Sequence, residues 1–173
     1  VQSWDTAFKD QEQNDYSACT TMGAGDTGYY VIDVFRTKLE YPQLFKRVIA
    51  MADKYKPDLI VIEDKASGQS LIQSLKSETR LPIKAIKVEN DKVLRAHLAT
   101  PTIEAGKVFL PHRAEWLNDF LSEMSAFPLA ANDDIVDSFN QNLASLTKYG
   151  RNITYGRSDT KTKYSNNFFK GMI

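Results

Sequence analysis

The chain has 173 residues, no net formal charge, 42% hydrophobic and 25% charged residues. This is the composition of one globular domain, and no apolar run approaches the roughly 20 residues that a transmembrane helix needs. The single cysteine, Cys19, excludes a disulfide framework and a cysteine-rich zinc site, and two distant histidines, His97 and His112, give no zinc-type pair.

The charge is distributed unevenly along the chain. Residues 148–173 hold six cations and one anion, so residues 1–147 carry the compensating negative charge. An acidic body argues against a protein that coats nucleic acid by bulk charge, and it is compatible with carboxylates gathered around metal ions. The chain begins at Val1 without a signal-peptide pattern, and we expect it to be a fragment of a longer polypeptide.

The first third of the chain predicts three antiparallel strands and a helix. Residues 1–8, 16–22 and 29–36 have the β-branched and aromatic content of strands, and a glycine-rich turn at 23–28 joins the second to the third. The same glycines could cradle a phosphate, but a strand follows them rather than a helix, so we favour a plain hairpin. Residues 41–55 predict an amphipathic helix that ends before Pro57.

The rest of the chain alternates strands with helices. The apolar run 59–62 is typical of a strand buried on both faces, and residues 83–88 and 108–110 predict two more strands. Helices are expected over 67–79, 92–105, 115–124 and 133–147, with a break near Pro101. Strands joined by helical crossovers should be parallel. We therefore expect one α/β domain over residues 1–148, with a mixed sheet of five or slightly more strands and helices on both faces, and a basic flexible tail over 149–173.

Acidic residues stand at three places where the chain could bring them together. Asp5 lies on the first strand and Glu63 directly follows the buried run, while the last helix begins with Asp133, Asp134 and Asp137. Grouped carboxylates repel one another unless they share divalent cations, and hard oxygen ligands suit Mg²⁺ or Mn²⁺. Two such ions about 4 Å apart can activate a water and stabilise the leaving oxygen in phosphodiester hydrolysis.

Each acid also has a plainer interpretation. Asp133 or Asp134 could cap the helix that follows, and Asp137 could be a solvated acid. Glu63 is harder to explain in this way, because open α/β sheets place ligands at the carboxyl ends of their strands.

Four cations lie near the same presumed edge of the sheet. They could contact phosphates that flank a cut, or they could be solvated surface residues. They are Lys65, Lys87, Lys92 and Arg95.

Several segments, taken in order, resemble a known family. They are SWDTA at 3–7, DYSA at 15–18, VIEDKASG at 61–68, IK at 86–87, DKVLRA at 91–96 and NDDIVDS at 132–138. Together, over residues 1–147, they resemble the C-terminal nuclease domain of the phage terminase large subunit, which belongs to the DNA-packaging motor.

The resemblance implies an RNase H-like fold and cleavage of double-stranded DNA with two Mg²⁺ or Mn²⁺ ions. It implies that Asp5, Glu63 and Asp134 are catalytic, and that Asp133 and Asp137 join these three as metal ligands. It also implies that the partners are double-stranded DNA, an ATPase half of the same polypeptide, the portal and the small terminase subunit, with no membrane. The expected location is the host cytoplasm during phage assembly.

Two other readings of the sequence remain open. One is a nuclease of the resolvase or integrase type, which has the same fold, and the other is a non-catalytic module for DNA binding or assembly. The chain has no GxxxxGK[ST] sequence, so we expect no ATPase activity from it.

Overall fold

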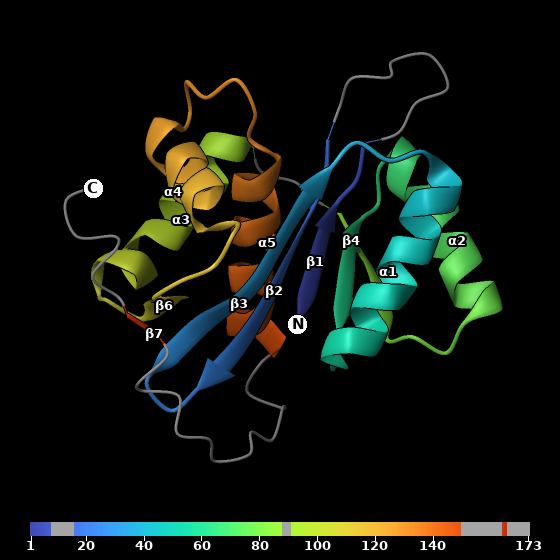
Figure 1. The fold of residues 1–173 in the computed structure, drawn as a ribbon, viewed down its shortest axis with the longest axis horizontal. Helices are drawn as coiled ribbons and strands as arrows, with labels where there is room; N and C mark the ends of the chain where they lie inside the picture. The colour runs from blue at the N-terminus through green and yellow to red at the C-terminus, as the bar shows by residue number, and fades with distance from the viewer. Residues whose placement is uncertain (8–15, 88–90, 150–163, 166–173) are drawn as a thin grey trace.

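The computed structural model describes residues 1–7, 16–87, 91–149 and 164–165, which form one mixed sheet and five helices (Figure 1). The strands are β1 (Gln2–Asp5), β2 (Ser17–Gly25), β3 (Gly28–Thr37), β4 (Ile60–Glu63), β5 (Ile83–Ile86), β6 (Val108–Pro111) and β7 (Tyr164–Ser165). The helices are α1 (Tyr41–Tyr55), α2 (Ala66–Glu78), α3 (Lys92–Glu104), α4 (Leu117–Ala126) and α5 (Asp134–Tyr149).

The strand order in the sheet is β5-β4-β1-β2-β3-β6-β7. The first three strands pair antiparallel, as predicted. Strands β4, β5 and β6, which follow helical crossovers, pair parallel with β1, β4 and β3 respectively. The expected mixed α/β sheet is therefore confirmed, and β4 is the direct neighbour of β1.

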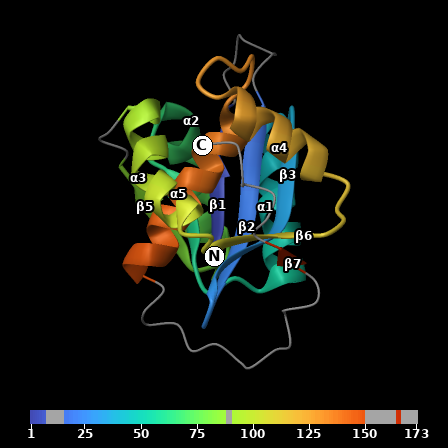
Figure 2. The same ribbon diagram turned by 90° about the vertical axis from the view of Figure 1, so that its left-hand side faces the viewer.

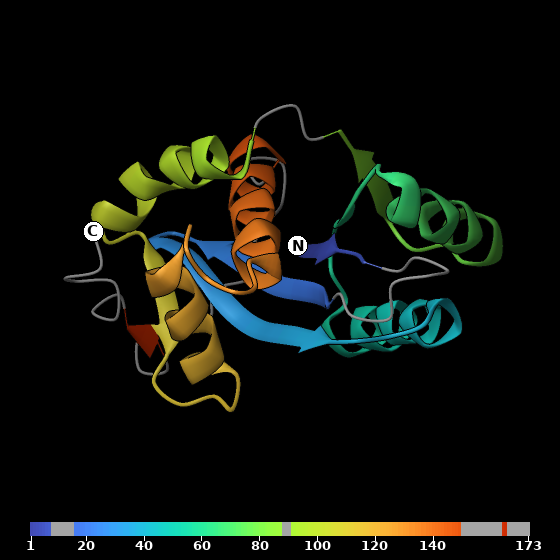
Figure 3. The same cartoon turned by 90° about the horizontal axis from the view of Figure 1, so that it is seen from above.

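Helices cover both faces of this sheet. On one face, α1 and α2 pack against Trp4, Ile60 and Ile62 in one apolar cluster. On the other face, α5 crosses β1 and β2 with α3 and α4 beside it, and Ala18 and Phe139 belong to this second cluster. Figures 1 and 3 show the two groups of helices on opposite sides, and Figure 2 looks onto the α3, α4 and α5 side. None of the described helices is both long and apolar enough to cross a membrane.

The glycine-rich segment differs from the expected turn in its length. Strands β2 and β3 stay paired up to Gly25 opposite Gly28, so only the two residues between them turn. Gly28 has φ of 152°, and a Cβ there would lie 2.1 Å from the carbonyl oxygen of Lys107. This glycine therefore allows the close approach of the chain that enters β6, and the predicted hairpin is confirmed.

Some predicted boundaries were wrong. Helix α3 continues through Pro101, which has no backbone N–H to donate to the His97 carbonyl. Both residues are exposed, so water can bind that carbonyl instead. Strand β1 ends at Asp5 rather than at residue 8, β5 ends at Ile86, and α4 begins at Leu117. Most of the predicted tail, 149–173, lies outside the described residues, apart from Tyr149 in α5 and the short strand β7.

Candidate metal centre

Two of the predicted acids end neighbouring strands. In the parallel ladder between β1 and β4, Trp4 pairs with Ile62. The next residue of β1 is Asp5, and the next residue of β4 is Glu63. Both strands therefore present a carboxylate at the same carboxyl edge of the sheet, which is the usual position for a ligand in a sheet of this kind.

The side chains of Asp5 and Glu63 project toward α5. Trp4 and Ile62 are fully buried in the layer formed with α1 and α2. Because side chains alternate along a strand, the next residue of each strand faces the opposite layer. The acids are thus placed under α5, which brings its own acids to the same edge.

A seam of buried hydrogen bonds holds α5 against β1 and β2. Ser138 Oγ donates to the Ser3 carbonyl at 2.8 Å and accepts from the Thr20 backbone N–H at 2.8 Å. Asn142 Nδ2 donates to the Thr20 carbonyl at 2.7 Å, and Ser3 Oγ donates to Gln141 Oε1 at 2.6 Å. Because these polar groups are buried, each lost bond would leave an unsatisfied partner, and the seam fixes how α5 sits above the strands.

A small cavity lies where the strand ends meet α5. Asp5, Glu63, Asp137, Gln141 and Arg95 line it, and its volume is about 10 Å³. That is the room that about one water molecule needs. Asp137 and Gln141 reach it together because they lie one helical turn apart on α5.

The electrostatics of the cavity disfavour three free carboxylates. Burial, together with the negative charges of Asp137, Asp134 and Glu63, raises the pKa of Asp5 to about 7. The pKa of Asp134 is also raised, first by burial and then by its neighbour Asp133. At neutral pH Asp5 is therefore partly protonated in the metal-free chain, and a bound cation would favour its ionised form.

Three of the four predicted cations are paired with these acids. Lys65 Nζ lies 2.6 Å from Glu63 Oε1, and Lys92 Nζ lies 2.7 Å from both carboxylate oxygens of Asp133. Lys92 also lies 3.5 Å from Asp137 Oδ2, and Arg95 donates to Asp137 Oδ1. Lys87, the fourth, is exposed just after β5, at the same edge of the sheet.

The start of α2 packs tightly against the end of β4. A Cβ at Gly68 would lie 2.0 Å from the Glu63 carbonyl oxygen. Only glycine allows the helix to approach this closely. The same contact determines where the Glu63 backbone lies, so α2 helps to position the acid of β4.

The structure separates the predicted acids into two groups. Asp5, Glu63 and Asp137 line the cavity, whereas Asp133 pairs with Lys92 outside it. Asp134 lies near enough for its charge to raise the pKa of Asp5. Within the described part of the chain, no three side chains of His, Cys, Asp or Glu are already arranged to hold a metal ion. The donor chemistry fits Mg²⁺ or Mn²⁺ nonetheless, because the cavity gathers carboxylate oxygens, and Lys65, Lys92 and Arg95 now neutralise part of their charge.

The amino-acid sequence matches one protein family over nearly all of the predicted domain. Residues 2–146 match the family described as the terminase RNase H-like domain. The chain belongs to this family. The fold and the resemblance predicted from the sequence are thereby confirmed for this terminase domain, and a nuclease-type domain is the function class that they support.

Solved structures of two viral proteins share the fold of the terminase domain. The large terminase nuclease of the thermophilic phage G20c, crystallised with bound zinc, has 21% sequence identity and a TM-score of 0.62, over 84% of this chain and 80% of that one. The fowlpox virus Holliday junction resolvase has 18% identity and a TM-score of 0.51, over 85% of this chain and 96% of that one. A structure of the fowlpox resolvase with Holliday junction DNA has 15% identity and a TM-score of 0.52, over 85% of this chain and 98% of that one. Among curated protein sequences, none is detectably similar to this chain.

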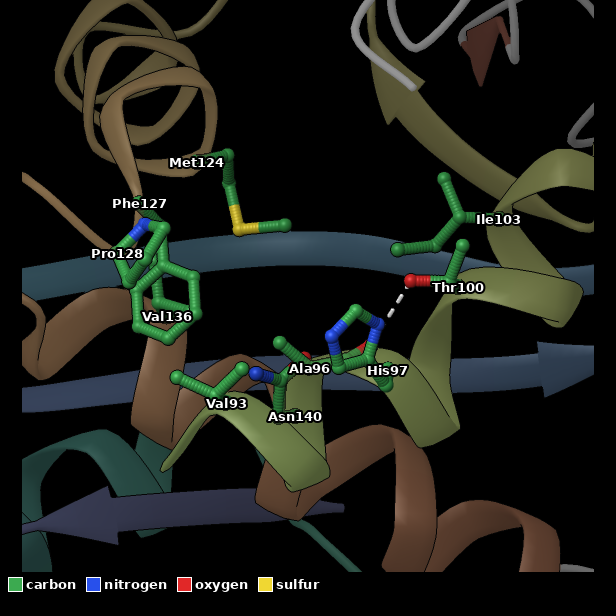
Figure 4. Close-up of a pocket in the computed structure, with 10 residues that line it drawn as sticks. All are labelled: Val93, Ala96, His97, Thr100, Ile103, Met124, Phe127, Pro128, Val136 and Asn140. Carbon is green, nitrogen blue, oxygen red and sulfur yellow. Dashed lines mark hydrogen bonds between the residues drawn. The ribbon is translucent and has the colours of Figure 1, made fainter. Parts of the chain in front are cut away.

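A second, larger cavity in the terminase domain lies between α3, α4 and α5 (Figure 4). Its volume is about 290 Å³, and apolar side chains such as Val93 and Met124 supply most of its lining. His97 and Asn140 also line it, and Thr100 Oγ1 donates to the Ala96 carbonyl at its wall. It contains no carboxylate, so it is not part of the acidic centre.

One residue that lines the acidic cavity was not predicted from the sequence. Gln141 lines the small cavity, and its position one turn after Asp137 was a usable signal. Glu123 on α4, which binds the start of α5, and its partner Arg36 on β3 were not predicted either, because they lie far from the acids in the sequence.

Proposed function

We propose that this chain is the metal-dependent endonuclease domain of a viral DNA-packaging terminase large subunit, and that it cuts double-stranded DNA by phosphodiester hydrolysis. The observation that carries the proposal is the meeting of Asp5, Glu63 and Asp137 in one cavity at the carboxyl edge of β1 and β4. Membership of the terminase family makes a nuclease the leading interpretation of that cavity.

The acids would hold two Mg²⁺ or Mn²⁺ ions. Asp5, Glu63 and Asp137 provide oxygens from the cavity itself, and Asp134 and Asp133 extend the set along the start of α5. Such ions lower the pKa of a bound water and stabilise the oxygen that leaves the phosphorus. The protein holds its carboxylates in place through the α5 seam, so little reorganisation is needed during reaction.

The nearby lysine and arginine side chains would contact the carboxylates before metal binding and DNA phosphates after it. In the metal-free chain Lys65, Lys92 and Arg95 neutralise the carboxylates. Divalent ions would take over that neutralisation, and the side chains would then contact phosphates on either side of the cut, together with Lys87. Phosphate contacts position DNA without reading its sequence, so we expect slight sequence preference.

The proposal predicts ion-dependent cleavage of supercoiled plasmid by the wild-type chain. Nicking and linearisation should require Mn²⁺ or Mg²⁺ and should stop in EDTA. Asp5→Asn and Glu63→Gln should each lower the cleavage rate by about 10³-fold or more, because each removes a ligand oxygen. Asp26→Asn, at the exposed hairpin turn, is the matched control and should cut at the wild-type rate.

Two results would overturn the proposal. One is a folded Glu63→Gln chain that cuts as fast as wild type. The other is a wild-type chain that neither cuts DNA nor binds Mn²⁺ in calorimetry at millimolar concentration, which would favour a non-catalytic assembly module. Binding of Mn²⁺ without cleavage would instead indicate that the chain needs help to bring DNA to the site. The expected ATPase half, portal and small subunit would provide that help inside the host cell.

A four-way DNA junction discriminates the resolvase alternative. The terminase proposal expects cleavage of linear duplex and junction arms at comparable rates. A strong preference for the branch point would favour a resolvase-type activity instead.

A further inference from the structure

A buried glutamate on α4 supports the start of α5 from outside that helix. Glu123 is 5% exposed, and its Oε1 accepts from the backbone N–H groups of Ile135 at 2.7 Å and Val136 at 3.1 Å. These are two of the first N–H groups of α5, which have no partner inside the helix. A carboxylate from a different helix therefore satisfies them.

The residue that would ordinarily do this is Asp133. Its carbonyl accepts the first intrahelical bond, from Asp137 N–H at 2.9 Å, so Asp133 occupies the N-cap position. An aspartate at that position usually turns its side chain back onto the second or third N–H group of the helix. Here the Asp133 carboxylate pairs with Lys92 instead, because Glu123 has already filled the capping role.

Arg36 connects Glu123 to the sheet. Its Nη1 donates to Glu123 Oε2 at 2.6 Å, so one carboxylate oxygen binds α5 and the other binds β3. Ala18 pairs with Arg36 on one side and with Asp5 on the other. Arg36 and Asp5 thus lie in the same row of the sheet, and the start of α5 is fixed relative to the row that carries the strand acid.

We propose that Glu123, held by Arg36, is a positioning residue for the acidic centre: it caps α5 so that the carboxylates of Asp133 and Asp134 stay available to the site. This inference rests on the proposed function, because it assigns Glu123 a role in metal binding. Removing the Glu123 carboxylate would leave two N–H groups unsatisfied. An aspartate at the N-cap ordinarily accepts from such groups, so we expect Asp133 to turn toward them and away from the site.

Mn²⁺ binding to the full 173-residue chain, measured by calorimetry, tests the inference. Glu123→Ala should weaken Mn²⁺ binding by about 10–100-fold, the usual effect of losing a partner that orients metal ligands. Glu123→Gln should weaken Mn²⁺ binding by less than Glu123→Ala, because its amide oxygen can still accept from both N–H groups although its amide nitrogen cannot accept from Arg36. Amide hydrogen exchange at Ile135 and Val136 should accelerate in Glu123→Ala and stay slow in Glu123→Gln.

Two controls separate positioning from simple loss of stability. Val48→Ala shortens a fully buried side chain of α1, on the other face of the sheet, and should lower the unfolding free energy without changing Mn²⁺ affinity. Asp119→Asn removes an exposed acid that lies 3.9 Å from Arg36 and should change neither quantity. If Glu123→Ala does not fold, Arg36→Met, at a less buried position, should reduce Mn²⁺ affinity in the same direction but by less.

The results can overturn this inference without touching the proposed function. Wild-type affinity for Mn²⁺ in Glu123→Ala and Arg36→Met would overturn the positioning role alone. Equal losses of affinity in Glu123→Ala and Val48→Ala would show that Glu123 acts only through stability. A wild-type chain that neither binds Mn²⁺ nor cuts DNA would overturn the proposed function itself.

Discussion

Asp5 shows how grouping the acids affects the stability of the folded chain. Burial and three neighbouring acids bring its pKa to about 7 in the folded chain, from about 3.8 for a free side chain. The raised pKa means that the folded chain binds this proton more tightly than the unfolded chain does. Stability from this residue is therefore full below pH 4 and is lost as the pH rises from about 4 to about 7.

Asp5→Asn should stabilise the metal-free protein, with a gain that grows across this pH range. In EDTA the gain should be near zero at pH 4 and on the order of 2–4 kcal/mol at pH 8, since one pKa unit corresponds to about 1.4 kcal/mol. Urea unfolding at several pH values measures it. Asp26→Asn should show no such trend, and an equal gain for Asp5→Asn at pH 4 and pH 8 would contradict the argument.

At the scale of elements, the contact between α2 and β4 shows how a helix can fix the strand that carries Glu63. Gly68 touches the Glu63 carbonyl so closely that no side chain fits between them. In most helices a change from glycine to alanine is stabilising by about 0.5–1 kcal/mol. Here the added methyl would push α2 away from the strand that carries Glu63, so the sign should reverse.

Gly68→Ala should destabilise the protein by about 1–3 kcal/mol, the usual cost of forcing a group into a filled space. It should also reduce cleavage, because Glu63 moves with its backbone. Gln69→Ala, at the exposed next position of the same helix, should leave both quantities within experimental error. Thermal unfolding and plasmid cleavage measure the two effects, and a stabilised Gly68→Ala chain would rule out the close contact.

For the whole molecule, the acidic centre joins the two layers of the fold. Glu63 follows a strand buried against α1 and α2, whereas Asp137 belongs to the helix on the other face. The carboxylates therefore come together only when both layers are packed on the sheet. A metal ion bound to them stabilises the folded chain alone, because the unfolded chain has no such site.

Mn²⁺ should raise the unfolding temperature of the whole domain. At 100 times the dissociation constant, binding contributes about 2.7 kcal/mol, which corresponds to roughly 5–10 °C for a chain of this length. EDTA should reverse the rise, and the double variant Asp5→Asn, Glu63→Gln should not respond to Mn²⁺. Scanning calorimetry over a Mn²⁺ series provides the measurement, and an equal rise in the double variant would place the binding elsewhere.

Local patterns in the sequence were enough to predict the class of fold and most of the acids. Alternation, apolar runs and helical spacing depend on neighbours in the chain. The order of strands and helices along the chain, the buried run before Glu63 and the acidic start of α5 were therefore all predictable. Errors fell where local preference was overridden by contacts from distant segments. The chain entering β6 packs closely against Gly28 at the end of the hairpin, and the exposure of Pro101 and His97 to water allowed α3 to continue.

Only the tertiary structure decided how the site is assembled. The parallel register of β1 with β4 placed Asp5 beside Glu63, and the α5 seam selected Asp137 and Gln141 as the residues that face them. The roles of Glu123 and Arg36 were equally invisible, because each depends on partners many residues away. Residue types and spacing determine which chemistry a chain can support, whereas register and helix packing determine which of its side chains meet.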